Sequence, residues 1–334
     1  MNRKVILVNR PEGLPKAGDF KIIQTELDTN LQKEEVLVQV DFASIDPSQR
    51  HWISKNSSEV NLGDNIKAVG CGTVLSSHSS TFKPGDHVSG LLGWQEFAKV
   101  HSAELYKLPS YEQPHLYLSV LGLTGLTAYF AVLEIARPQK QDTMLVSNAA
   151  GAVGSIACQI GKMKGCRVVG IAGSEEKCRW MTDQVGIDAC VNYKKAINLA
   201  RSIKSACPGG VDIYIDNVGG EMLDSVLLNI NKYAKVILCG AISAYNLSLA
   251  PRIYYYPLII SMSASLIGFE VWDYRHRFGL ATQSLNKWEQ EGRLKHREQI
   301  LKGLHKAPKA LQMLLLGQNT GKLIIKIHSK SPKI

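Results

Sequence analysis

Residues 143–155 of the chain read TMLVSNAAGAVGS. The apolar run 143–147 predicts a buried strand, and the pattern that follows predicts a helix over Val153–Lys164. Glycine in the turn between them lets the backbone bend tightly and lets the helix pack closely on the strand. A helix that begins there directs unpaired N–H groups and the positive end of its dipole at a ligand. The AxxGxxG spacing therefore predicts a dinucleotide-binding turn, with a merely structural turn as the alternative. Its contacts would come from Gly151, Ala152, Val153 and Gly154.

The alternation of strand and helix continues downstream. Apolar runs lie at 167–171, 189–191, 211–216 and 234–239, and helical patterns separate them. Repeats of this kind place parallel strands in one sheet with helices on both faces. We therefore predict an α/β fold with a doubly wound parallel sheet of the Rossmann type.

The first part of the chain has a different pattern. Short alternating runs such as 36–42 and 87–92 are separated by clusters of turn residues, which predicts a compact barrel-like β domain. Residues 322–327 alternate like a strand that has no α/β partner nearby, so we expect them to return to this domain. The expected domains are a catalytic part at 1–122, a dinucleotide-binding domain at 123–293, and a segment at 294–334 that rejoins the catalytic part.

The end of the second strand bears on which dinucleotide binds. An NAD site needs an acidic residue there for the ribose 2′-hydroxyl, but this strand runs into Ala-Gly-Ser at 172–174. Ser174, Lys177 and Tyr193 instead supply a hydroxyl, an ammonium and a phenol, which suit a 2′-phosphate. We interpret the glutamates at 175–176 as first-turn helix residues. The sequence therefore predicts NADP(H). The alternative for Lys177 is that it is an ordinary exposed lysine of the helix.

Two further strand ends carry glycines. The fourth strand ends in Asp-Asn-Val-Gly-Gly at 216–220, and the fifth in Cys-Gly-Ala-Ile-Ser at 239–243. Both would lie at the carboxyl edge of the sheet, where ligands bind in this architecture. These segments are therefore either ligand contacts or simple turns.

Composition limits the class of protein. The chain has 334 residues, of which 45% are hydrophobic and 20% charged, as in ordinary globular proteins. It has no uninterrupted apolar run of ~18 residues that would suit a membrane span, and the apolar run after Met1 is too short for a secretory signal. Seven scattered cysteines without a CxxC pair are typical of reduced thiols. We therefore expect a cytoplasmic protein that has no contact with membranes.

The net charge of +10 is concentrated in the second half, above all in 287–333. A basic segment of this kind is usually a solvated helix face, but it could also steer a phosphate-rich cofactor or bind nucleic acid. No RNA motif with interleaved aromatic residues accompanies the lysines. A nucleic-acid-binding protein that is not an enzyme is therefore the less favoured alternative.

Several motifs together resemble one known family. The segments 148–155, 173–177, 192–194, 216–220 and 239–244 are similar to the zinc-independent medium-chain dehydrogenase/reductases. The most similar branch is that of the prostaglandin reductases, leukotriene hydroxydehydrogenases and 2-alkenal reductases. Outside the dinucleotide domain, the resemblance includes RPEG at 10–13, SIDP at 44–47, GWQE at 93–96, GLTGLTAY at 122–129 and QNTGK at 318–322. It covers nearly the whole chain, from about residue 3 to 327.

The resemblance implies a GroES-like β-barrel catalytic domain together with the Rossmann domain, and a homodimer. It implies NADPH-dependent reduction of the C=C bond of α,β-unsaturated ketones and aldehydes, with hydride added to the β-carbon and a proton to the α-carbon. Cofactor contacts are implied at the glycine turn and at Lys177 and Tyr193. Further implied contacts are Thr127, Asn217, Cys239, Gly240, Ala241, Ile242, Ser243, Tyr245, Phe269, Glu270, Val271 and Asn319.

The metal-binding members of this superfamily show what the chain lacks. A zinc alcohol dehydrogenase would need a Gly-His-Glu run, whereas the equivalent stretch here is AVGCG at 68–72. His78, His87 and His101 are isolated in the sequence. Without zinc, alcohol oxidation would lose its Lewis acid. The sequence therefore favours metal-free reduction of an activated alkene, with NADPH-dependent quinone reduction as a competing reaction.

Two stretches depart from the family pattern. The substrate-side motif commonly reads Asp-Pro-Tyr-Met-Arg, but here it is Asp-Pro-Ser-Gln-Arg at 46–50. The helix expected before Phe269, at 261–268, lacks the family's polar and basic residues. Our candidate catalytic hydroxyls, which could donate to a developing oxyanion, are Ser48, Tyr254 and Tyr256. Aromatic packing or a dimer contact is the alternative for the tyrosines, and the identity of the substrate is left open.

Overall fold

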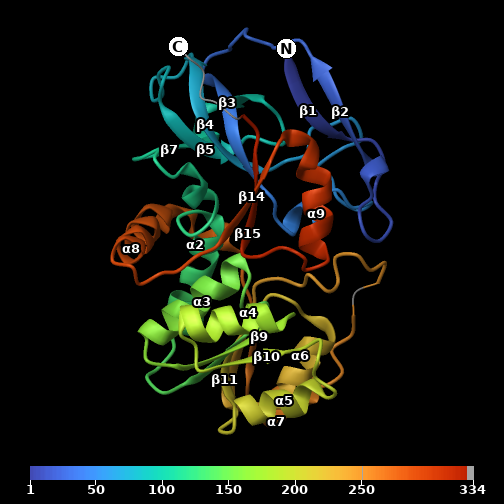
Figure 1. Ribbon diagram of the computed structural model, residues 1–334, viewed down its shortest axis with the longest axis vertical. Coiled ribbons are helices and arrows are strands. Elements are labelled where there is room, and N and C mark those ends of the chain that lie inside the picture. Colours follow the sequence, from blue (N-terminus) through green and yellow to red (C-terminus); the bar gives the residue numbers. More distant parts are fainter. Residues whose placement is uncertain (250, 329–334) are drawn as a thin grey trace. The chain divides into compact units, whose positions relative to one another are not determined.

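The computed structural model describes residues 1–249 and 251–328. The chain divides into two compact units (Figure 1). One consists of Met1–Leu118 with the segment from Glu298 onward, and the other of Ser119–Arg297. The divisions expected from the sequence, after residues 122 and 293, lie a few residues from these. Each unit is built around its own sheet.

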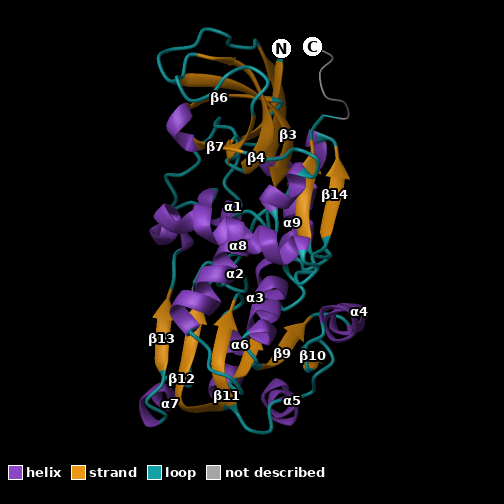
Figure 2. Ribbon diagram, turned by 90° about the vertical axis from the view of Figure 1, so that its left-hand side faces the viewer, coloured by secondary structure: helices purple, strands orange, loops and turns teal. Residues whose placement is uncertain are grey.

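The unit Ser119–Arg297 contains a six-stranded parallel sheet with the order β10-β9-β8-β11-β12-β13. Its strands are β8 (Thr143–Val146), β9 (Arg167–Ala172), β10 (Ala189–Asn192), β11 (Val211–Asp216), β12 (Ile230–Leu238) and β13 (Ser265–Gly268). Figure 2 shows β11, β12 and β13 side by side with their arrowheads at the same end. The carboxyl ends of the strands therefore meet at one edge, which confirms the doubly wound sheet predicted from the sequence.

Helices connect these strands. They are α2 (Leu123–Phe130), α3 (Ala152–Met163), α4 (Glu175–Arg179), α5 (Leu199–Ala206), α6 (Gly220–Leu227), α7 (Pro257–Ser261) and α8 (Phe278–Gln290). Short π-helical segments at Ala131–Ala136 and Trp180–Val185 continue α2 and α4, and a 3₁₀ segment spans Val271–Arg277. The helix α3 begins one residue after Gly151, at the turn from which the dinucleotide site was predicted.

Residues 261–268 differ from the expectation. The sequence predicts a helix there, but α7 ends at Ser261 and Ser265–Gly268 form the edge strand β13. This strand pairs in parallel with β12, from Lys235 opposite Ser265 to Leu238 opposite Gly268. The predicted helix is therefore wrong for these residues, because pairing with an existing sheet edge satisfies the same backbone groups.

The centre of this sheet is buried on both faces. All four residues of β8 are buried, and Leu145 of β8, Tyr214 of β11 and Val236 of β12 belong to one core cluster. Strands covered by helices on both faces read as continuous apolar runs. This burial is the physical reason why the strand could be recognised in the sequence.

The other unit contains a seven-stranded sheet with the order β14-β15-β3-β4-β5-β7, in which β6 also pairs with β3, and a separate hairpin of β1 and β2. The strands are β1 (Asn2–Leu7), β2 (Phe20–Thr25), β3 (Glu35–Ser44), β4 (Val69–Ser77), β5 (His87–Leu91), β6 (Phe97–His101), β7 (Leu105–Lys107), β14 (Glu298–Lys302) and β15 (Lys322–Lys326). Its helices are α1 (Ser48–Trp52) and α9 (Ala307–Leu315), with 3₁₀ turns at Ala17–Asp19, Ser102–Glu104, Pro114–Leu118 and Leu304–Lys306. Across 1–249 and 251–328, none of the helices has the length and apolar character needed to cross a membrane.

The strand β15 joins the two ends of the chain within this unit. It pairs antiparallel with β3, with Ile324 opposite Ser44, and parallel with β14. The side chains of Leu323 and Ile325 are fully buried in the same core as Trp94. This barrel-like β unit matches the one predicted from the short alternating runs.

We expect Leu145→Ala to lower the free energy of unfolding by about 2–5 kcal/mol, because it removes a fully buried side chain from β8 and leaves a cavity. The matched control is Leu228→Ala, because that leucine is 47% exposed and should change stability by less than about 0.5 kcal/mol. Urea unfolding followed by circular dichroism measures both. Equal losses would contradict the burial assigned to β8.

Candidate functional site

The carboxyl edge of the parallel sheet is organised by one buried carboxyl group, that of Asp216 at the end of β11. Its Oδ1 atom accepts hydrogen bonds from Ser147 Oγ (3.0 Å) and from the Tyr214 hydroxyl (2.8 Å). The backbone N–H groups of Val218 (2.9 Å) and Gly219 (3.0 Å) donate to the same oxygen. Four donors on one acceptor hold the turn after β11 in a single conformation.

The ends of the neighbouring strands are tied to the same point. The backbone N–H of Asn217 donates to Ser147 Oγ, and its amide Nδ2 donates to the Ser147 carbonyl, both at 2.8 Å. The N–H groups of Cys239 (2.8 Å) and Gly240 (3.1 Å), after β12, donate to the Asp216 carbonyl. The structure thus brings together the predicted cofactor contacts Asn217, after β11, and Cys239 and Gly240, after β12, at the ends of two adjacent strands.

Burial raises the pKa of the Asp216 carboxyl, and the hydrogen bonds from Gly219 and Val218 act in the opposite direction. Burial also raises the pKa of the Tyr214 phenol well above its ordinary value, and the nearby Asp216 charge adds to this. Within the described part of the chain, the second carboxyl oxygen of Asp216 has no hydrogen-bond partner. A protonated Asp216 would remove the cost of a buried charge.

Our sequence analysis did not single out Ser147 or Asp216 as site residues. Both are polar residues that end a buried apolar strand, and Asp216 is fully buried. A polar side chain at the end of such a strand is the signal that could have identified them, because it faces the edge where ligands bind.

The glycine turn before α3 has no room for side chains. A β-carbon on Gly151 would lie 2.5 Å from Asn148 Nδ2, and one on Gly154 would lie 2.3 Å from the Asn148 carbonyl oxygen. Gly151 is the N-cap of α3 and offers no side chain to its first turn. The N–H groups of Ala152, Val153 and Gly154 are therefore left to a ligand, which fits the pyrophosphate of a dinucleotide.

The ends of β9 and β10 gather cationic and hydroxyl groups. Ser174 caps α4 by accepting from the Lys177 N–H at 3.2 Å. A β-carbon on Gly173 would lie 3.2 Å from the Tyr193 ring and 3.5 Å from Lys194 Cε. Burial lowers the pKa of the Lys177 ammonium, and the neighbouring ammonium of Lys194 lowers it further. A buried cation with a second ammonium beside it suits an anion such as a 2′-phosphate.

The glutamate next to this cluster is occupied elsewhere. Glu175 accepts a hydrogen bond from Asn192 Nδ2 at 2.8 Å and lies 3.7 Å from the Lys195 ammonium. The hydrogen bond from Asn192 and the charge of Lys195 lower the pKa of this carboxyl. The Glu175 carboxylate therefore interacts with Asn192 and Lys195. Lys194 is a residue that the sequence analysis did not assign to the site, although it follows Tyr193 directly.

The segment after β12 folds back on the turn after β11. Ile242 N donates to the Asn217 carbonyl (3.4 Å), and Ser243 Oγ donates to the Val218 carbonyl (2.6 Å). The Tyr245 hydroxyl accepts from the N–H of Ala241 at 3.2 Å. These contacts place the phenol of Tyr245 at the carboxyl edge of the sheet.

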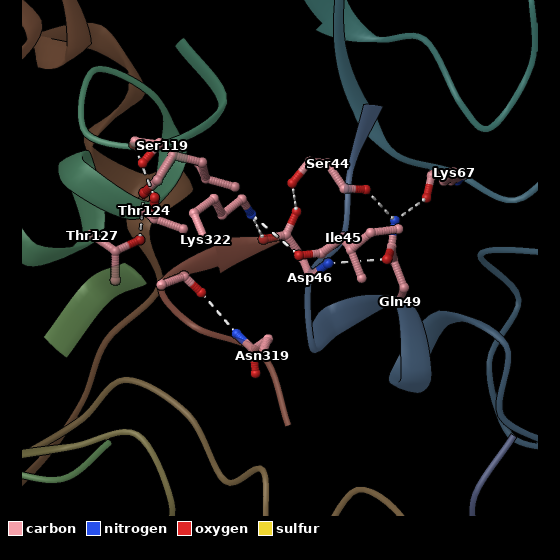
Figure 3. A network of polar contacts seen from close by, with 12 residues as sticks. Ser44, Ile45, Asp46, Gln49, Lys67, Ser119, Thr124, Thr127, Asn319 and Lys322 are labelled. Atoms are coloured by element: carbon pink, nitrogen blue, oxygen red, sulfur yellow. Dashed lines mark hydrogen bonds and ion pairs between the residues drawn. The ribbon is translucent and has the colours of Figure 1, made fainter. Parts of the chain in front are cut away.

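Four other predicted contacts of this unit lie after β13 or on α2. Phe269, Glu270 and Val271 directly follow β13 at its carboxyl end, and Val271 is buried. Thr127 lies on α2, which packs against α3, and its hydroxyl donates to the Leu123 carbonyl at 2.7 Å (Figure 3). The roles predicted for these residues stay predictions.

The tyrosines predicted as catalytic are placed differently. The N–H groups of Tyr254 and Tyr255 donate to Asp224 Oδ1 of α6, and the Tyr254 and Tyr256 side chains are 70% and 59% exposed. Tyr256 begins α7, which leads into the amino end of β13. Within this chain, the structure therefore does not bring Tyr256 to the carboxyl edge where Asn217 and Tyr245 lie.

The remaining predicted residues belong to the other unit. Ser48 is the first residue of α1 and is half-buried. Asn319 is buried, and its Nδ2 donates to the Gly321 carbonyl at 2.7 Å (Figure 3).

Among residues 1–249 and 251–328, no three His, Cys, Asp or Glu side chains are grouped so that they could hold a metal ion. Cys71, in the stretch equivalent to a zinc motif, is buried, and burial raises its thiol pKa to about 12.

We expect Gly154→Ala to weaken NADPH binding by at least about tenfold, because the added β-carbon must displace the start of α3 from Asn148. Gly279→Ala in α8 is the matched control, since a β-carbon there meets nothing within 4 Å. Fluorescence titration with NADPH measures both variants. Unchanged affinity in Gly154→Ala would contradict the assignment of this turn to the cofactor.

Comparison with known proteins agrees with this geometry. Residues 3–108 match the family model described as the N-terminal domain of oxidoreductase, and residues 152–285 match the one described as zinc-binding dehydrogenase. The NADPH-dependent curcumin reductase of Escherichia coli is 36% identical and covers 98% of this chain and 97% of its own length. The NADP-dependent 2-alkenal reductase of Nicotiana tabacum is 35% identical, with the same coverage of both chains.

A solved structure extends the comparison to three dimensions. CurA from Vibrio vulnificus, in complex with NADPH, is 34% identical and superposes with a TM-score of 0.92 over 98% of this chain and 100% of its own. At this coverage the match includes both units. The chain belongs to the medium-chain dehydrogenase/reductases, in the branch of the prostaglandin reductases and NADP-dependent 2-alkenal reductases.

Proposed function

We propose that this protein uses NADPH to reduce the C=C bond conjugated to the carbonyl group of α,β-unsaturated ketones and aldehydes. The observation that carries the proposal is the cluster of Ser174, Lys177 and Tyr193, joined by Lys194, where an NAD enzyme would have an acid. The relatives that cover nearly the whole chain are named as NADPH- or NADP-dependent reductases, one of them of 2-alkenals. Together these observations support both the cofactor and the type of reaction.

The cofactor would be held along the carboxyl edge of the parallel sheet. The N–H groups of Ala152–Gly154 would bind the pyrophosphate, and Lys177 with its neighbours would bind the 2′-phosphate. Asn217 and the segment 239–245 would lie against the nicotinamide end, with Thr127, Phe269–Val271 and Asn319 as further proposed contacts. When bound, NADPH supplies the hydride for the β-carbon of the substrate.

The chain's own part in the reaction is to bind and orient the substrate carbonyl. A hydroxyl donor placed at the carbonyl oxygen stabilises the negative charge that develops there. We propose Ser48 for this role. Tyr254 and Tyr256 stay candidates from the sequence, although Tyr256 of this chain leads into the amino end of β13 and not to its carboxyl end. Tyr245 is a phenol at the carboxyl edge of the sheet beside Asn217, so it is the natural comparison in any substitution series.

We also propose a homodimer in the cytoplasm. The strand β13 is the last strand of its sheet, Leu266 on it is 36% exposed, and the nearby Ile260 is 74% exposed. An exposed sheet edge with apolar side chains is a common dimer contact. All seven cysteines are free thiols, which fits a reducing compartment.

The reaction is tested with purified protein, NADPH and a panel of 2-alkenals, enones and quinones. We expect the loss of NADPH absorbance to depend on the alkenals and enones, with reduction at the C=C bond confirmed by mass spectrometry and NMR of the product. A chelator should leave the rate unchanged. Turnover of quinones alone would favour quinone reduction, and turnover of no substrate would contradict the proposal.

Cofactor choice is tested with Lys177→Ala. We expect the KM for NADPH to rise by at least about tenfold, because a charge-assisted contact to the 2′-phosphate is lost, while the KM for NADH changes less than about twofold. Arg201→Met, which removes an exposed cation from α5 of the same unit, is the control and should change neither value. Equal losses for the two cofactors would show that Lys177 does not contact the phosphate.

A further inference from the structure

An ion pair between a buried lysine and a half-buried aspartate lies in the unit that carries Ser48 and Asn319. Lys322, the first residue of β15, is only 3% exposed, and its ammonium pairs with Asp46 Oδ1. The same ammonium donates to the Ile45 carbonyl at 3.3 Å. Figure 3 shows the lysine side chain directed at the turn that begins with Asp46.

Several hydrogen bonds restrain the segment from Ser44 to Asp46. The Ser44 hydroxyl donates to Asp46 Oδ2, and the Asp46 N–H donates to Gln49 Oε1 at 3.0 Å. Gln49, which is fully buried, donates from Nε2 to the carbonyls of Ser44 (3.2 Å) and Lys67 (3.1 Å). The N–H of Ile45 donates to the Leu323 carbonyl at 3.1 Å. Each polar group named here has a partner from the chain itself.

The position of the pair in the sheet gives it a role. The strand β3 ends at Ser44 and β15 begins at Lys322, and because the two strands are antiparallel these ends lie at the same edge. Beyond that edge, the segment after β3 continues to Ser48, and the segment before β15 begins near Asn319. The ion pair is thus the last contact between the two segments before each leaves the sheet.

Stability alone does not account for such a pair. Desolvating two charges costs several kcal/mol per ion, and well-packed apolar residues often stabilise a protein as much or more. A buried ion pair does, however, impose one geometry, because only one arrangement satisfies both charges. It is therefore suited to fixing two segments at a set separation.

We propose that Lys322 is a positioning residue for the reaction: paired with Asp46, it fixes the segments Asp46–Ser48 and Asn319–Gly321 relative to each other. The inference rests on the proposed function, in which Ser48 faces the substrate and Asn319 the cofactor. In this proposal, Lys322 needs no contact with either of them. It acts through the backbone of the two segments, whose small side chains reach only as far as the backbone places them.

The test compares Lys322→Met, Asp46→Asn and the double variant. We expect each single variant to lower kcat/KM for an enone by at least about tenfold at saturating NADPH. The double variant should lose no more than Lys322→Met alone, because the two residues act as a unit. For Asp46→Asn, the Kd for NADPH should stay within about twofold, since the turn that it disturbs carries the substrate-side residue. Lys322→Arg, which keeps the charge, should recover part of the activity.

Two controls separate positioning from folding. Lys326→Met removes a cation that lies over the Phe42 ring on the same strand, 5.5 Å from its centroid, and should leave kcat/KM unchanged. Ile325→Val weakens the adjacent core and should lower Tm while the folded enzyme keeps its kcat/KM. A Lys322→Met enzyme that keeps kcat/KM within about twofold, or that loses activity only in proportion to Tm as Ile325→Val does, would overturn the proposal.

A second measurement does not depend on catalysis. In Lys322→Met, we expect faster amide hydrogen exchange in residues 44–50 and 317–323 together, with residues 36–40 of β3 unchanged. If the wild-type enzyme reduced no enone, the proposed function would fail while the exchange result still decided whether the pair fixes both segments. Unchanged exchange in both segments would sink the positioning role even in an active enzyme.

Discussion

The structure depends first on how closely α3 begins against the chain that precedes it. A single added carbon at Gly154 would meet the Asn148 carbonyl at 2.3 Å, so the helix can start here only with glycine. This closeness fixes the helix axis and aims its first N–H groups at the carboxyl edge of the sheet. Because the same edge collects the ends of β8, β11 and β12, this steric constraint shapes the place where we propose that the dinucleotide lies.

Charge is distributed around that edge in a consistent way. The buried Asp216 lies at the end of β11, where four donors on one carboxyl oxygen join the ends of β8 and β11. Its backbone carbonyl accepts from the residues that follow β12. The cations Lys177 and Lys194 sit at the ends of β9 and β10, where burial and mutual repulsion lower the pKa of Lys177. An anion bound there would relieve this repulsion. The Asp216 carboxyl, in contrast, accepts hydrogen bonds from backbone N–H groups. The buried carboxyl therefore orders the strand ends, whereas the two cations are the groups that we propose for binding the 2′-phosphate.

Much of this was predictable from the sequence, and the exceptions have physical reasons. The parallel sheet and the glycine turn were recognisable because buried strands are uniformly apolar and the turn tolerates only small residues. Ser147 and Lys194 were missed, and Asp216 was noted only as part of the segment 216–220. Their roles arise from which strand ends become neighbours, and local periodicity does not reveal strand order. The strand β13 was mistaken for a helix because four residues at a sheet edge owe their conformation to β12 and not to their own pattern. The pairing of Lys322 with Asp46 joins residues far apart in the chain, so only the fold reveals it.

The serine at position 48 explains why the pairing of Lys322 with Asp46 matters for the proposed reaction. A tyrosine, as in the common family motif, carries its hydroxyl on a long ring and can adjust through its side-chain torsions. A serine hydroxyl lies one carbon from the backbone, so its position is set by the turn itself. A chain that has serine in place of this tyrosine must therefore hold the turn more firmly if the serine hydroxyl is to reach a substrate oxygen. The buried Lys322, the fully buried Gln49 and the Ser44 hydroxyl do so, because together they restrain the Ser44–Asp46 backbone that leads directly to Ser48.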